Sequence, residues 1–138
     1  MSLNADLVRA RCAEIDESVR RLEQFSSMPL DQFLASPDGK DIACYRLLVA
    51  IEASLALCYH VSAKLLREVP EEYAECFAIL GRAGLIPEEL ASRLQQMARF
   101  RNLLVHLYWK LDYERVHEFV RTRLGDLRDF QAAVARLL

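Results

Sequence analysis

Glycine and proline are scarce in this sequence, and their scarcity already restricts the fold. The 138 residues contain four of each, while 53% of the residues are hydrophobic. Strand-rich folds usually need more turn-forming residues, and a disordered chain would be less apolar. A chain of this length can bury a sizeable core. We therefore expect one all-α domain over 1–138, a four- to five-helix up-and-down bundle.

Closely spaced cysteines and an apolar leader are also missing. The four cysteines form no C-x-x-C pair, which favours reduced thiols in the core over metal ligands; they are Cys12, Cys44, Cys58 and Cys76. The start MSLNADLVRARC lacks the long apolar core of a signal peptide. We expect a cytoplasmic protein with no metal, no cofactor and no membrane partner. The nearly apolar segment 47–63 contains Glu52 and His60, which favours a buried bundle helix over a membrane span.

An excess of positive charge is the third missing feature. The formal net charge is −2, which gives no general attraction to nucleic acid. Any contact with RNA must therefore come from a local basic patch. The segment 93–115 holds five basic residues against Asp112 and Glu114, a modest phosphate-attracting patch. The five are Arg93, Arg99, Arg101, Lys110 and Arg115.

Apolar spacing and helix-end signals predict where the helices lie. We expect a first helix to about residue 26, a short helical turn in PLDQFLAS, and a loop at SPDGKD. A long central helix should cover 41–68 and a third 71–83, with Gly84 in the left-handed conformation that follows a helix end. IPEEL should open a fourth helix. Asp112 should cap a final helix over 113–137, loosened near Gly125.

The stretch RNLLVHLY, residues 101–108, gathers Arg101, Asn102, His106 and Tyr108 on the fourth helix. At about 100° per residue, Arg101 and Tyr108 share one stripe and Asn102 and His106 share its neighbour. Arg101 and His106 are about 140° apart on an ideal helix. They therefore converge only if the helix distorts or a second chain completes the site.

An arginine and a histidine suffice to cleave RNA without a metal ion. A guanidinium can hold a phosphate through two hydrogen bonds, and an imidazole titrates near neutrality. The 2′-hydroxyl would attack, His106 would act as acid or base, and Arg101 would stabilise the charged phosphorane. Pattern alone nevertheless favours surface ion pairs for such residues, so spacing does not decide between the two interpretations.

The array Arg101-x4-His106-x-Tyr108 resembles the HepT branch of the HEPN superfamily. These proteins are ribonuclease toxins paired with a minimal nucleotidyltransferase antitoxin. The flanks YAECFAILGRAGLIPEELASRLQQMARF and WKLDYERVHEF carry the resemblance further, and so do RCAEIDESVRRL and AIEASLALCYHVSAKL. Asn102, directly after the arginine, also fits. The resemblance covers nearly the whole chain.

The resemblance implies a function, its site and its partners. It implies a homodimer in which two facing motif helices form one cleft, and a metal-independent endoribonuclease with Arg101 and His106 as the catalytic pair. Tyr108 would be the acceptor to which the antitoxin transfers AMP. Asn102, which is part of the motif, would bind substrate or support the site. Glu52, outside the motif, is a second candidate for this role on the ground given below. The alternative is a non-catalytic HEPN module that binds nucleotide or scaffolds the nucleotidyltransferase, and the intact Arg/His pair favours the enzyme.

A polar stripe interrupts the central helix, because Tyr45, Glu52 and Tyr59 recur every seventh residue. Burying Glu52 without a partner would be costly. An intrachain ion pair or hydrogen bond is the favoured explanation. The alternative is that Glu52 orients Arg101 or lines the cleft.

Four further residues have a structural and a functional interpretation. For His60 we favour a hydrogen-bonded core or interface position over catalysis. For His117, among Glu114 and Glu118, we favour a solvated face. Trp109 and Tyr113 could stack a base, but packing within the bundle is favoured.

Overall fold

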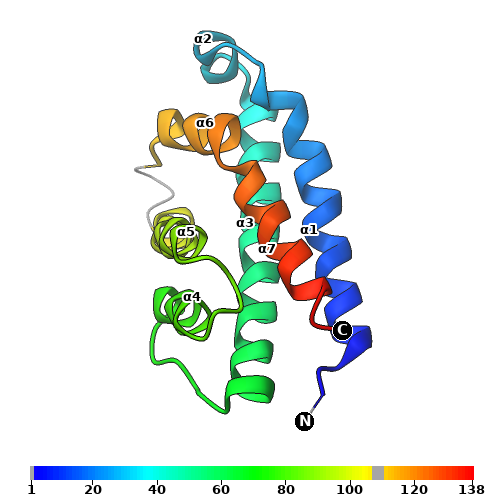
Figure 1. The fold of residues 1–138 in the computed structure, drawn as a ribbon. Helices are drawn as coiled ribbons and strands as arrows, with labels where there is room; N and C mark the ends of the chain where they lie inside the picture. The colour runs from blue at the N-terminus through cyan, green and yellow to red at the C-terminus, as the bar shows by residue number, and fades with distance from the viewer. Residues whose placement is uncertain (1, 107–110) are drawn as a thin grey trace.

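The structure, a computed structural model, describes residues 2–106 and 111–138, and these form seven α-helices, one π-helical turn and no strand (Figure 1). The elements are α1 (Ala5–Ser26), α2 (Leu30–Leu34), α3 (Pro37–Val61), the π-helical turn η1 (Ser62–Leu66), α4 (Tyr73–Arg82), α5 (Glu88–His106), α6 (Tyr113–Thr122) and α7 (Leu124–Ala135). The all-α prediction is confirmed. The predicted count of four or five helices is too low, because α2 is a helix of its own and the C-terminal helix is divided.

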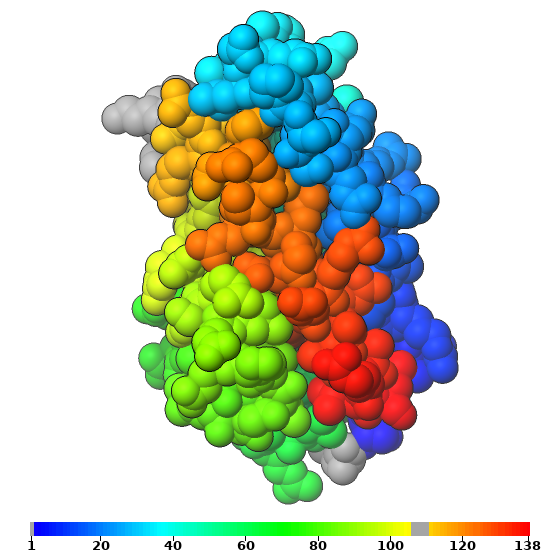
Figure 2. Space-filling model, turned by 45° about the horizontal axis from the view of Figure 1, so that its top comes forward, coloured from blue at the N-terminus to red at the C-terminus, as the bar shows by residue number. Residues whose placement is uncertain are grey.

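The central helix is α3, and every other helix contacts it. Figure 1 shows α1 running along α3, with α7 between them in front, while α4 and α5 are seen end-on beside α3. The pair α4 and α5 therefore crosses the long axis of α3, which departs from a simple up-and-down bundle. Figure 2 shows the face on which α6 and α7 meet α1 and α2. Both α6 and α7 also contact α3.

By length and composition the segment Pro37–Leu66 could cross a membrane, but half of its most apolar window is buried within the fold. Fully buried side chains such as Leu47 and Ile51 on α3 join a core shared with the other helices. Across this core Phe77 of α4 and Phe130 of α7 pack edge-to-face at 5.3 Å. The packing supports the prediction of a bundle helix.

The start of α3 contradicts the predicted loop at SPDGKD. Ser36 is the N-cap, and its Oγ accepts a hydrogen bond from the Gly39 N–H at 3.0 Å. Pro37 occupies the first turn, where its missing N–H costs nothing. At Gly39 an added Cβ would lie 2.8 Å from Ser36 Oγ and 3.3 Å from the Phe25 ring, so the glycine serves close packing. The apparent turn signal is a helix-start signal.

The other end of α3 also differs from its prediction. The α-helix ends at Val61 and passes into η1, and Arg67, with φ 54°, then stops the helix. The predicted end at Glu68 is thus a few residues late. Gly84, with φ 76°, has the left-handed conformation that we expected.

The C-terminal helix begins as predicted but is broken in the middle. Asp112 caps α6 through Oδ1, which accepts from the Glu114 and Arg115 N–H groups at 3.0 and 3.4 Å. The predicted single helix over 113–137 is wrong, because the chain leaves helical geometry at Arg123 (φ −120°, ψ 2°) and α7 restarts at Leu124. The break lies close to Gly125, near which we expected loosening.

His117 is buried, which contradicts the predicted solvated face. Its side chain is 7% exposed, and Nε2 lies 2.6 Å from the carbonyl oxygen of Met28. Because a carbonyl can only accept, Nε2–H is the donor. The His117 ring also packs on Phe33, with ring centroids 5.4 Å apart. The charged neighbours on α6 gave no sign that α2 would cover this face.

His60 is hydrogen-bonded as we expected. Its Nε2 accepts from the backbone N–H of Asn4 at 2.9 Å, and the ring is half-buried. Asn4 is itself the N-cap of α1, so this bond ties the start of α1 to the end of α3.

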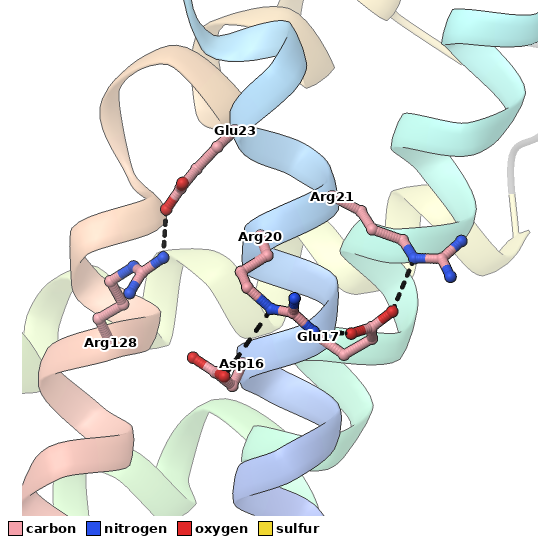
Figure 3. A network of polar contacts seen from close by, with 6 residues as sticks. All are labelled: Asp16, Glu17, Arg20, Arg21, Glu23 and Arg128. Atoms are coloured by element: carbon pink, nitrogen blue, oxygen red, sulfur yellow. Dashed lines mark hydrogen bonds and ion pairs between the residues drawn. The ribbon is translucent and has the colours of Figure 1, made fainter.

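Charged side chains cover the outer side of α1 and extend to α7 (Figure 3). Glu17 accepts from Arg20 and, at 2.8 Å, from Arg21 Nε. These guanidinium groups lower the pKa of the Glu17 carboxyl, the hydrogen bond from Arg21 most of all. One ion pair, Glu23 with Arg128, joins α1 to α7. The arrangement is that of a solvated face.

Candidate active site

Arg101 occupies the inner edge of α5, where three helices meet. Its side chain is only 14% exposed. Its Nε donates to Oε1 of Glu52, on α3, at 2.5 Å. Its Nη1 lies 3.3 Å from Oδ1 of the adjacent Asn102. A guanidinium has five N–H donors in a fixed fork, so most of them remain available to a ligand.

Glu52 is on the surface, although the sequence suggested a buried position. Its side chain is 46% exposed, and its partner is Arg101. The favoured intrachain ion pair is therefore confirmed. Because its partner is the motif arginine, the same contact also meets the requirement of the alternative, that Glu52 orients Arg101. That role stays a prediction.

Tyr73, at the start of α4, provides a further contact to Arg101. The guanidinium carbon lies 4.7 Å from the Tyr73 ring centroid, which is a cation–π geometry. Tyr59 of α3 packs edge-on against Tyr73, with ring centroids 6.0 Å apart. Partial burial, followed by the neighbouring Cys76 and Tyr73, raises the pKa of the Tyr59 hydroxyl. Sequence reasoning missed Tyr73, because only the crossing of α4 over α3 brings it near the motif.

A surface hollow of about 940 Å³ opens beside Arg101. Its charged lining consists of Glu71 and Glu72 from the start of α4 and Arg99 and Arg101 from α5. Since Glu52 also lies against Arg101, carboxylates at least balance the arginines here. The hollow can position one phosphate on Arg101, but its described side chains carry no net positive charge that would attract a polyanion.

The remaining motif residues are only partly described. His106 is the last residue of α5. An uninterrupted helix places its Cα about 140° around the axis from that of Arg101. Tyr108 lies outside the described residues, and so do Trp109 and Lys110. Of the predicted site residues, the structure brings Arg101, Asn102 and Glu52 together.

Tyr113 packs inside the bundle, as we expected. It lies partly buried against the core, with Lys40 Nζ 4.9 Å from its ring centroid. Partial burial raises the pKa of its hydroxyl, and the neighbouring Cys44 adds to the rise.

The cysteines are free thiols. Cys58 and Cys76 are buried, whereas Cys12 and Cys44 are half-buried. Burial raises the pKa of Cys44 to about 11 and that of Cys58 further. Within 2–106 and 111–138, no three His, Cys, Asp or Glu side chains gather in a way that could hold a metal ion.

Comparison with known proteins identifies the fold and the family. Solved structures share the fold, and two of them illustrate it. The chain aligns with a tri-AMPylated Shewanella oneidensis HEPN toxin in complex with MNT antitoxin, with a TM-score of 0.86 and 23% identity over 96% of this chain and 99% of that one. The cytosolic protein YutE of Bacillus subtilis, of unknown function, gives 0.85 and 16% identity, over 99% and 92%. The fold is therefore of the HEPN type.

The sequence comparisons are more specific. The family model described as ribonuclease HepT-like matches residues 15–134. The mRNA nuclease HepT of Shewanella oneidensis is 25% identical over 91% of this chain and 93% of its own length. The tRNA nuclease HepT of Aphanizomenon flos-aquae is 26% identical over 80% and 75%. The chain belongs to the HepT-like ribonuclease family, as the motif predicted.

Proposed function

We propose that this protein is a cytoplasmic, metal-independent endoribonuclease toxin that cleaves RNA with Arg101 and His106. The observation that carries the proposal is the placement of Arg101. Glu52 holds its Nε, and the Tyr73 ring lies over its guanidinium. A guanidinium fixed in this way can stabilise charge on a phosphorane without first being ordered. The nuclease names of two relatives support the same activity.

The reaction would use the RNA's own 2′-hydroxyl as nucleophile. The hydroxyl loses a proton to a base and attacks the adjacent phosphorus, and the 5′-oxygen leaves with a proton from an acid. His106 would perform one of these transfers, since an imidazole can exchange protons near neutrality. Arg101 would bind the non-bridging oxygens. The products are a 2′,3′-cyclic phosphate and a 5′-hydroxyl.

A homodimer would complete this site. In one copy the helix geometry separates Arg101 from His106 by about 140°. If two α5 helices faced each other, Arg101 of one protomer could meet His106 of its partner. Both residues would then act on one phosphodiester.

The partner that restrains the toxin would be a minimal nucleotidyltransferase antitoxin. The Shewanella oneidensis structure shows a HEPN toxin that is tri-AMPylated and bound to such a protein. We propose Tyr108 as the acceptor of AMP here. The added phosphodiester would occupy the arginine meant for the substrate phosphate.

The catalytic assignment is tested with Arg101→Ala and His106→Ala. Each should lose cleavage by at least about a hundredfold, while helical content and association stay those of the wild type. Cleavage should continue in EDTA, and mass spectrometry of the products should show cyclic phosphate ends. Full activity of either variant, or loss in EDTA with recovery in Mg²⁺, would disprove the mechanism. A wild type that cleaves no RNA but binds the nucleotidyltransferase would support the scaffold alternative instead.

The modification site is tested by intact mass. After incubation with the nucleotidyltransferase and ATP, the wild type should gain AMP units, and Tyr108→Phe should gain none. Tyr113→Phe is the matched control, because Tyr113 is the next tyrosine in the chain. Equal labelling of Tyr108→Phe and wild type would place the acceptor elsewhere.

A further inference from the structure

A second hollow, of about 210 Å³, lies on the other edge of α5, between α5, α6 and the start of α7. Three of its lining residues are arginines and two are phenylalanines. The residues that matter are Arg93, Gln96, Phe100, Arg115, Phe119 and Arg123. It shares no lining residue with the hollow beside Arg101. We call it the three-arginine pocket.

Asp126 orders two of these arginines. Its Oδ1 accepts from Arg93 Nε at 2.8 Å, and its Oδ2 lies 3.7 Å from Arg123 Nη1. The Asp126 side chain is only 13% exposed, so it acts as a fixed anchor. The bond to Arg93 uses Nε and leaves the two terminal nitrogens of that guanidinium to other acceptors. Arg123 Nη2 is further positioned by Gln96 Oε1 at 3.3 Å.

Aromatic rings form the rest of the pocket. Phe100 and Phe119 are stacked, with ring centroids 5.5 Å apart and ring planes 10° from parallel. The Arg115 guanidinium carbon lies 5.5 Å from the Phe100 centroid. Phe100 is 7% exposed, with Phe119 stacked on its ring and Arg115 over it, so the rings form the floor of the pocket. The arginines are the groups that can contact the phosphates of a nucleic acid.

The surface of α5 connects the two hollows. No Asp or Glu occurs from residue 90 to residue 111. Arg99 lies exposed on the outer face of α5, between the edge with Arg101 and the edge with Arg93. Arg93 and Arg101 are eight residues apart, which is about 12 Å along the helix axis. A strand of RNA with one phosphate on Arg101 could cross Arg99 and reach the three-arginine pocket.

The charges of the two hollows favour cleavage beside Arg101 and RNA binding in the three-arginine pocket. Beside Arg101, glutamates balance the arginines. In the three-arginine pocket, Glu118 is paired with Arg121 at 2.7 Å, and Asp126 is shared by two arginines. Among the residues that the structure describes, the excess of positive charge therefore lies outside the proposed catalytic hollow. Affinity for a polyanion follows from such contacts with phosphate groups.

We propose that the three-arginine pocket is an accessory binding site for the phosphodiester backbone of the RNA substrate, one that sets affinity for long RNA without taking part in cleavage. This inference rests on the proposed ribonuclease function.

The test compares substrates of two lengths. In the variant Arg115→Gln, Arg123→Gln, KM for an RNA of about twelve nucleotides should rise about tenfold with kcat unchanged. Cleavage of a dinucleotide, which cannot span from Arg101 to the pocket, should stay at the wild-type rate. The single variant Arg115→Gln should show a smaller effect in the same direction. Arg115 has no ion pair among the described residues, so its loss leaves the Asp126 network in place.

A binding measurement with an RNA that cannot be cleaved tests affinity for RNA separately from the cleavage step. With a 2′-O-methyl RNA, which lacks the nucleophile, the double variant should bind more weakly, and log Kd against log salt should lose about 0.7 of slope per phosphate contact removed. Arg9→Gln, an exposed arginine on α1, is the control for the charge change and should behave like the wild type.

Each other outcome has a definite meaning. Normal cleavage with unchanged KM and salt slope in the double variant would overturn the accessory site and leave the ribonuclease function standing. A wild type that neither binds nor cleaves RNA would overturn both. Loss of antitoxin binding, or of AMP binding, with RNA affinity unchanged would assign the pocket to that ligand and overturn the inference.

Discussion

Arg101 is held by a charged contact on one side and an aromatic contact on another. The Glu52 carboxylate accepts a hydrogen bond from Nε, while the face of Tyr73 attracts the cation without using a donor. A second carboxylate in place of the ring would compete with a substrate phosphate for the same N–H groups. The aromatic contact therefore orients the guanidinium and leaves its hydrogen-bonding capacity free.

We expect Tyr73 to be a positioning residue for Arg101, so two substitutions should distinguish the effect of its ring from that of its hydroxyl. Tyr73→Phe keeps the ring face, so cleavage should match the wild type. Tyr73→Ala removes a contact of about 1 kcal/mol, and kcat should fall about fivefold with the oligomeric state unchanged. Single-turnover cleavage checks both. Equal activity of Tyr73→Ala and wild type would show that the Tyr73 ring does not position Arg101.

At this scale the sequence predicted the motif but not its surroundings. Arg101 and Asn102 are recognisable because they occur in a motif of fixed spacing. Glu52 could be named as a possible partner, because a carboxylate in an apolar helix requires one. Tyr73 and the burial of His117 depend on which helix crosses which, and no local pattern contains that information.

At the scale of the helices, too, local sequence signals predicted some features, while others depend on tertiary packing. The starts of α5 and α6 follow from IPEEL and from Asp112, because capping depends on neighbouring residues. SPDG was misassigned because its residues serve turns and helix starts equally well. The packing of Gly39 near Phe25 decides between the two.

The hydrogen bond between α1 and α3 predicts that the stability of the fold depends on pH. His60 accepts the Asn4 N–H through Nε2, which it can do only when neutral. Burial, followed by the charge of Lys64, lowers the pKa of His60 below its ordinary value of 6.5. The unfolded chain therefore takes up this proton at a higher pH than the folded protein. The contribution to stability is present above the ordinary pKa and is lost as pH falls through the folded value.

We expect this loss to be below about 1 kcal/mol, since the bond is partly exposed to water. Between pH 7.5 and 5, amide exchange at Leu7 and Val8 in the first turn of α1 should accelerate in the wild type. In His60→Gln, whose amide oxygen can accept at any pH, exchange corrected for its intrinsic pH dependence should stay constant. The same acceleration in both proteins would assign the effect to another group.

At the scale of the whole molecule, the described residues leave one face of α3 open. The other helices cover most of α3, but Tyr45 is 61% exposed and Ile42 is 41% exposed. Ala56 also lies exposed, one turn from Glu52 on the same side. An apolar strip next to the proposed catalytic arginine is suited to association with a second copy. Because Ala56 is exposed, it can be enlarged without disturbing the core.

Ala56→Arg should therefore give a folded monomer that does not cleave RNA, while Ala13→Arg, at an exposed alanine on α1, should remain an active dimer. Sedimentation at micromolar concentration checks the association.

Mixing Arg101→Ala with His106→Ala tests whether the site is shared between protomers. If each site takes its arginine and its histidine from different copies, one of the two sites in every mixed dimer is intact. Half of the dimers are mixed at equal concentrations, so activity should return to about a quarter of the wild-type level. A mixture that stays inactive although mixed dimers form would place both residues of each site in the same protomer.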